Sequence, residues 1–160
     1  MFIELNGDGV EAPNAAAKTI KCLQIASGAI YTDDAGSWSE LHDAKLQALD
    51  SIVAEAAGAP VLVAYHWKHD LTRLLKAFPR GRHLDNNPQT LRDWNAGKIP
   101  VLFAHPASAG QIQAGHNRPV FIHHIITVDT VDELVAERRQ SKREVQDILL
   151  GAMKKRDTKC

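Results

Sequence analysis

Between residues 60 and 110 the chain alternates short apolar runs with segments of helical spacing. The predicted elements are, in order, a strand at 61–65, a helix at 71–78, an extended piece at 82–84, a helix at 87–97 and a strand at 99–104. Apolar strands that alternate with helices pair in parallel, and helices cover both faces of their sheet. Ligands of such sheets bind at the carboxyl ends of the strands, so loops 66–69 and 105–110 are the candidate site.

The pattern before residue 60 is weaker. Residues 1–12 are short, acidic and contain glycine, so we expect a poorly ordered entry. Asn14 is a predicted N-cap for a helix that ends at Gly28, and a polar loop is expected at 32–39. A clear amphipathic helix follows Asp43, its predicted N-cap, with apolar positions 46, 49, 52, 53 and 56 on one stripe.

After residue 110 the chain is polar and irregular until Val120–Ile126, a β-branched run that predicts a third strand. Thr130 followed by Glu133 has the spacing of a capping box, and Ser141 followed by Glu144 repeats it. We therefore expect two helices, or one bent helix, as a helical C-terminal extension. The predicted organisation is an N-terminal helix and linker at 1–42 and one lobe at 43–160.

Composition narrows the range of functions. The 160 residues are 44% hydrophobic and 24% charged with a formal net charge of zero, so no global field favours nucleic acid or a membrane. The two cysteines, Cys22 and Cys160, form no disulfide framework, which favours a reduced, cytoplasmic setting. The first residues lack the features of a signal peptide, and no apolar stretch is long enough to span a membrane.

The sequence offers candidate residues for a metal site and for a hydrolase, but no nucleotide-binding motif. His66 and His69, with Asp70, are the best metal candidates among eight histidines, but a zinc site needs three or four ligands and we assign no metal. Ser108 with His105 or His66 suggests a small hydrolase, which is disfavoured because no acid partner and no GxSxG pattern are present. Walker A and GxGxxG patterns are absent.

Positive charge has two interpretations. The small-residue turn at 107–110 lets backbone amides approach a phosphate, or is simply a tight turn. Basic residues in and after the first loop are a phosphate surface or a solvated face. They are Lys68, Arg73, Lys76, Arg80 and Arg82.

The chain resembles the second RecA-like lobe of Swi/Snf-type superfamily-two helicases, in the compact phage and prophage form. Residues 61–70 resemble the strand and loop of helicase motif IV, and 94–110 resemble the approach to motif V, the most specific part. Residues 21–31 resemble the segment that joins the two lobes, and 44–49 the helix that opens the second. Residues 118–133 resemble the segment on the C-terminal side of motif VI. The likeness covers nearly the whole chain.

The chain departs from the family after Gly110. In the family a further strand and helix come after motif V and lead to the arginines of motif VI, whereas here Gly110 passes directly to 111–118. Gln113 falls where one of those arginines would be. Such arginines stabilise charge on a transferred phosphoryl group, so ATP turnover is not expected without them and without a first lobe. Loss of a βα unit also suggests a homodimer or strand exchange.

The sequence thus predicts an α/β fold: a small, mainly parallel, RecA-like sheet flanked by helices. The resemblance implies weak, sequence-independent DNA association, with Lys68, Ser108, Gly110 and Arg118 as phosphate contacts and no catalytic residue. No cofactor is expected, and ATP only if a partner supplies a separate helicase first lobe. The alternative is an interaction or self-associating module with no role at nucleic acid.

Overall fold

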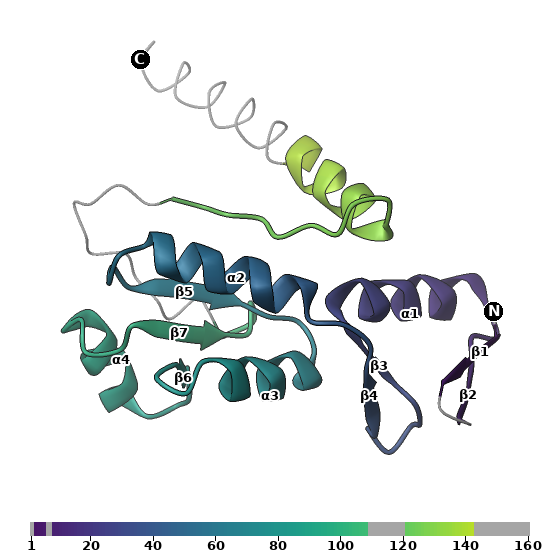
Figure 1. Cartoon of the computed structure of the whole chain (residues 1–160), viewed down its shortest axis with the longest axis horizontal. Coiled ribbons are helices and arrows are strands. Elements are labelled where there is room, and N and C mark those ends of the chain that lie inside the picture. The colour runs from purple at the N-terminus through teal and green to yellow at the C-terminus, as the bar shows by residue number, and fades with distance from the viewer. Residues whose placement is uncertain (1, 6–7, 109–120, 143–160) are drawn as a thin grey trace, which may run out of the picture.

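The computed structural model describes residues 2–5, 8–108 and 121–142, and its centre is a three-stranded parallel sheet (Figure 1). The strands are β5 (Val61–Ala64), β6 (Arg82–His83) and β7 (Val101–Ala104), in the order β5-β7-β6. β5 and β7 pair in register from Val61 opposite Val101 to Ala64 opposite Ala104. The parallel sheet predicted from the apolar runs is confirmed.

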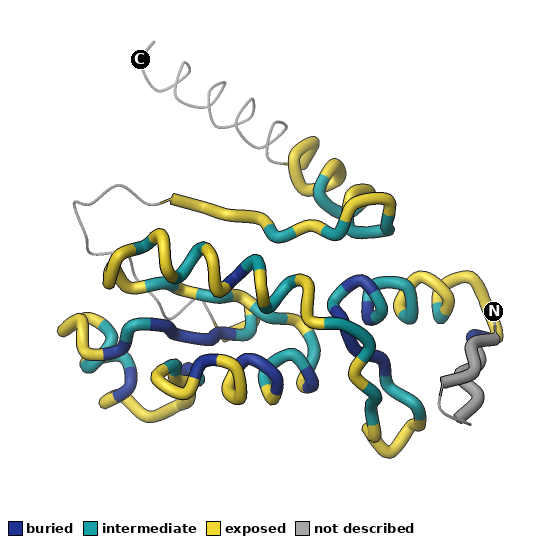
Figure 2. The backbone as a smooth tube through the Cα atoms, in the orientation of Figure 1, coloured by how far each residue is buried: buried dark blue, intermediate teal, exposed yellow. Residues whose placement is uncertain are grey.

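Helices cover the two faces of the sheet unequally. On one face, α2 (Ala44–Glu55) and α3 (Lys68–Ala77) pack through a core of Leu49, Leu74, Phe78, Val101 and Phe103. On the other, the region of α4 (Pro88–Asn95) contributes a smaller core of Leu84, Ile99, Leu102 and Ala104, with Trp94 packed against it. All four residues of β7 are therefore buried, as Figure 2 shows along the central strand. None of the helices in the described part of the chain is long and apolar enough to cross a membrane.

Two of the helices have an N-cap side chain that bonds an amide of the first turn, and a third has none. α1 (Ala15–Ser27) begins at Asn14, whose side chain accepts a hydrogen bond from the amide of Ala17 at 2.8 Å, and ends at Gly28 with φ of 101°. Asn87 caps α4 in the same way, through the amide of Gln89 at 2.9 Å. Asp43 occupies the N-cap of α2 but makes no capping bond, because its carboxylate accepts from the side chain of Gln47 instead.

Two antiparallel hairpins precede α2, and the sequence patterns predicted neither. β1 (Phe2–Leu5) pairs with β2 (Asp8–Glu11), so the prediction of a poorly ordered entry is wrong. The dipeptide Asn6-Gly7 is a strong two-residue hairpin signal that was available in the sequence. β3 (Ala29–Tyr31) pairs with β4 (Trp38–Glu40), so the expected loop ends before Trp38.

The prediction of a third strand at 120–126 is wrong, because residues 121–127 form no regular structure. This segment runs along α2 on the side away from β5 (Figure 1). Ile125 packs against the α2 and α3 core, and the hydroxyl of Thr127 donates to the carbonyl of Ala26 at 2.9 Å. Strand propensity depends on a neighbouring strand, and none lies beside this segment in the described part of the chain.

A helix is present at 131–142, the last described residues. Thr130 stands at its start, and its hydroxyl accepts from the amide of Asp132 at 3.2 Å. The carboxylate of Asp132 bonds Lys45 of α2 and the amide of Thr127. Ser141 lies inside this helix rather than at a new N-cap, and the predicted second apolar face, from residue 145 onward, lies outside the described residues.

Candidate functional site at the carboxyl ends of the strands

The carboxyl ends of β5 and β7 bring the two predicted loops together. Ala64 and Ala104 are register partners, and the amide of Tyr65 continues the pairing by donating to the carbonyl of Ala104 at 3.2 Å. The rings of His66 and His105 are then stacked, with centroids 6.1 Å apart and planes 27° from parallel. The prediction that loops 66–69 and 105–110 share one edge is confirmed for their described residues.

A tyrosine and a histidine from the strand ends join this edge, and the sequence patterns did not single them out. The hydroxyl of Tyr65 lies 2.9 Å from Nε2 of His83, the last residue of β6, and its ring lies 5.8 Å from that of His105. Burial raises the pKa of the Tyr65 phenol, so this hydroxyl keeps its proton at neutral pH while it lies in hydrogen-bond contact with the His83 ring. The signal in the sequence was that Tyr65 ends a predicted strand and His83 lies in a predicted extended piece.

Lys68 is the exposed cation of this edge. It is the first residue of α3, and its ammonium has no ion-pair or hydrogen-bond partner in the described part of the chain. The helix terminus itself is occupied, because the carboxylate of Asp70 accepts from the amide of Trp67 at 3.1 Å. A phosphate would therefore meet the Lys68 side chain rather than the helix N-terminus, and Asp70 weakens the local positive potential.

Ser108 is exposed in the turn after β7, but the amides of that turn are already used. The amide of Ser108 donates to the carbonyl of His105 at 2.8 Å, and that of Ala107 donates to Nδ1 of the His105 ring at 3.2 Å. Only the Ser108 hydroxyl remains for a ligand among these groups. Gly110 and Arg118, the other two predicted phosphate contacts, lie outside the described residues.

The remaining basic residues do not extend this surface, contrary to one interpretation of the sequence. α3 runs back along the sheet for about 15 Å, so Lys76 and Arg80 lie toward its opposite edge. Arg82, at the start of β6, bonds Asp93 at 3.3 Å. Arg73 is buried and belongs to a separate network.

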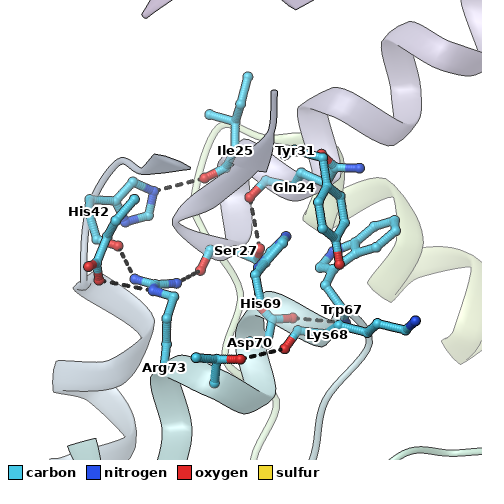
Figure 3. Close-up of polar contacts among 12 residues, drawn as sticks. Gln24, Ile25, Ser27, Tyr31, His42, Trp67, Lys68, His69, Asp70 and Arg73 are labelled. Atoms are coloured by element: carbon cyan, nitrogen blue, oxygen red, sulfur yellow. Dashed lines mark hydrogen bonds and ion pairs between the residues drawn. The ribbon is translucent and has the colours of Figure 1, made fainter. Parts of the chain in front are cut away.

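Figure 3 shows that network, which joins the N-terminal segment to the lobe. The Arg73 guanidinium donates to the carboxylate of Glu40 at 3.0 Å, to the carbonyl of Ser27 at 2.9 Å and to the carbonyl of His42. Gly28 lies against it: a Cβ there would stand 2.2 Å from the His42 carbonyl oxygen and 2.9 Å from the guanidinium. Arg73 is thus a structural cation, and its exposed fraction is 4%.

The surroundings of His69 disfavour it further as a metal candidate. Its ring is buried among aromatic rings, 4.8 Å from Tyr31, 5.9 Å from Trp38 and 6.2 Å from Trp67. His66 by contrast is exposed, with its ring centroid 4.5 Å from that of Trp67, so the two histidines lie in different environments. Among the described residues no group of three histidine, cysteine or acidic side chains could hold a metal.

The hydrolase hypothesis also lacks its geometry. The Nδ1 atom of His105 is engaged by the Ala107 amide, and no hydrogen bond joins the Ser108 hydroxyl to His105 or His66 in the described part of the chain. A serine nucleophile needs a base within hydrogen-bond reach. The site therefore presents exposed polar and aromatic groups suited to binding.

Comparison with known proteins places the chain beside a phage protein. It is 58% identical over 191 aligned positions to protein p41 of Acyrthosiphon pisum secondary endosymbiont phage 1. The alignment covers 98% of this chain and 42% of p41, so the chain spans less than half of that relative's length. No model of a protein family and no solved structure matches the chain.

The aligned part of p41 is longer than this chain. The 191 positions of the alignment exceed the 160 residues of this chain by 31, so at least 31 positions within the aligned part of p41 have no counterpart here. A strand–helix–strand unit takes about 30 residues. The difference is therefore the size of one such unit.

Proposed function

We propose that this chain is a truncated Swi/Snf-type helicase C-terminal lobe that associates with DNA weakly and without sequence preference. By itself it does not turn over ATP, since Walker A and the motif VI arginines are missing from its sequence. We expect it in the cytoplasm of a bacterial host, because its relative belongs to a phage of an endosymbiont. A separate first lobe, if one pairs with it, would bring the nucleotide.

One observation carries the DNA proposal: the motif IV-like and motif V-like loops leave adjacent parallel strands at the same edge. Lys68 of the first loop and the Ser108 hydroxyl of the second are both exposed there, and the Lys68 ammonium is unpaired among the described residues. A lysine and a hydroxyl are common contacts to a phosphate backbone, and such contacts carry no sequence information. The charge of Lys68 is opposed by the nearby Asp70, which supports weak binding.

The length difference from p41 supports the truncation. The sequence departs from the helicase pattern between Gly110 and Arg118, at the place where the family has a further strand and helix. The 31 or more unmatched positions of p41 agree in size with that unit. We propose that they are the same segment.

Fluorescence anisotropy of a labelled DNA duplex at two salt concentrations tests the proposal. The affinity for DNA should fall steeply as salt rises. Lys68→Ala should make the negative slope of log K against log salt shallower by about 0.9, because one phosphate contact is lost. Lys76→Ala is the matched control, because Lys76 is an exposed lysine of the same helix at its far end. Absence of binding at low salt, or equal effects of the two variants, would contradict the proposal.

The alternative is an interaction module without a role at nucleic acid. It is favoured by the exposed apolar side chains after residue 120, of which Phe121 is 80% and Ile122 65% exposed. A protein that ignores DNA at low salt but changes mass with concentration would fit this alternative.

A further inference from the structure

The lateral edge of the sheet along β5, which is distinct from the strand ends described above, is open in the described part of the chain. β5 is the outer strand, with β7 on its inner side. The amides of Val61 and Tyr65 donate to Pro100 and Ala104, so the odd-numbered residues of β5 face β7. In a parallel ladder the alternate residues then direct both backbone groups outward. Leu62 and Ala64 therefore present their N–H and C=O groups at the open edge.

The sheet face above this edge is also uncovered. Leu62 and Leu102 are register partners on the same face, yet Leu62 is 45% exposed while Leu102 is fully buried. The side chains of Leu84, Ile99 and Trp94 thus cover this face over β7 but not over β5. Sheets built from parallel strands are normally covered on both faces, so among the described residues β5 lacks both a second neighbouring strand and a covering element. An unpaired strand edge of this kind is a template for pairing with another chain.

The same chain carries an unpaired segment with the composition of a strand. Residues 121–124 are all exposed, and no backbone hydrogen bond of theirs is formed within the described part of the chain. They are four residues long, as β5 is. Directly after them, Ile125 packs on the α2 and α3 core and Thr127 bonds Ala26, which holds the segment along α2, where it forms no pair with β5 of its own copy (Figure 1).

We propose that the β5 edge binds residues 121–124 of a second copy of this chain as an added strand. Because each copy has both the edge and the segment, the exchange is reciprocal and gives a closed two-fold dimer. Phe121 or Ile122 would then cover the exposed face at Leu62. The occupant is a second copy because, among the described residues, the edge and the segment both lack backbone partners, occur in one chain and match in length. The proposal is independent of DNA binding.

Sedimentation velocity over a range of concentrations, with hydrogen exchange on the same samples, tests this interface. We expect a dimer in which the amides of Leu62 and Ala64 gain protection together with those of 121–124 as concentration rises. Ala64→Pro removes an N–H that points outward, so it should leave the β5–β7 pairing intact and weaken the dimer by about tenfold or more. Far-UV circular dichroism of the variant checks that the monomer still folds.

Two further variants keep the test decisive if Ala64→Pro fails to fold. Leu62→Lys places a charge at the exposed face and should also dissociate the dimer. Ile20→Ser is the matched control, because Ile20 on α1 is 45% exposed, as Leu62 is, and lies outside the interface. A mass that stays monomeric, protection at Leu62 and Ala64 that is independent of concentration, or a dimer in which both amides exchange freely would each overturn the proposal.

Discussion

Replacement of Arg73 by methionine tests how the N-terminal segment is attached to the lobe. Methionine keeps most of the aliphatic volume but removes the guanidinium, which leaves the carbonyls of Ser27 and His42 without their donor. A partly buried acceptor that loses a charged donor costs about 1.5 kcal/mol or more. Two such acceptors give about 3 kcal/mol, a large part of the usual 5–15 kcal/mol of stability.

The contact to Glu40 should contribute little to this total. Its side chain is 49% exposed, and ion pairs with a solvated partner are worth about 0–1 kcal/mol. Glu40→Gln, which keeps an acceptor oxygen, is therefore the control, with an expected cost below about 1 kcal/mol. Urea unfolding of both variants measures the difference, with the m-value as a check on two-state behaviour.

If Glu40→Gln destabilised the protein as much as Arg73→Met, charge pairing rather than the hydrogen bonds to the two carbonyls would hold the segment, contrary to this prediction. A cost of Arg73→Met below about 1 kcal/mol, the value of one ordinary hydrogen bond, would contradict the prediction as well.

Two further predictions concern single groups. Gly28→Ala should destabilise the fold by several kcal/mol, because φ is 101° and the new Cβ would stand 2.2 Å from the His42 carbonyl oxygen; thermal unfolding measures it, and a loss below about 1 kcal/mol would contradict the geometry. The raised pKa of Tyr65 means that the folded state holds its proton more tightly, so this contribution to stability is present at neutral pH and is lost as pH rises above about 10, the ordinary value. Absorbance titration of the phenols should show a late step that Tyr65→Phe removes, and a late step that this variant leaves unchanged would contradict it.

The parallel sheet could be predicted because both β5 and β7 are continuous apolar runs. A strand of a parallel sheet that is buried on both faces, as β7 is, needs no alternation, and β5 has the same apolar run although one of its faces is exposed among the described residues. The N-caps at Asn14 and Asn87 could also be predicted, because an N-cap side chain bonds within the first turn of its own helix. The hairpins β1–β2 and β3–β4 were missed because strands of three or four residues leave little pattern, and only Asn6-Gly7 marked one of them.

The candidate site was predictable as far as topology determines it. Parallel pairing places the loops after β5 and β7 at one edge, which brings Lys68 near the turn of Ser108 without any knowledge of side chains. His69 and Arg73 were misread, because on a helix their spacing is that of a solvated polar face. The surface that buries them comes from α1, β3 and β4, more than 25 residues earlier in the chain, and local spacing contains no information about it.

The wrong prediction at 120–126 and the open edge of β5 have a common explanation. Strand propensity describes a side chain that fits between neighbours, so a β-branched run forms a strand only where an edge is within reach. Under the truncation proposed above, the run begins shortly after the point where a unit has been lost, and at least 31 positions of p41 have no counterpart in this chain. If the missing unit normally lies between β5 and this run, its removal leaves one edge and one strand-forming segment unpaired in each copy. A second copy satisfies both requirements at once, whereas a DNA phosphate satisfies neither.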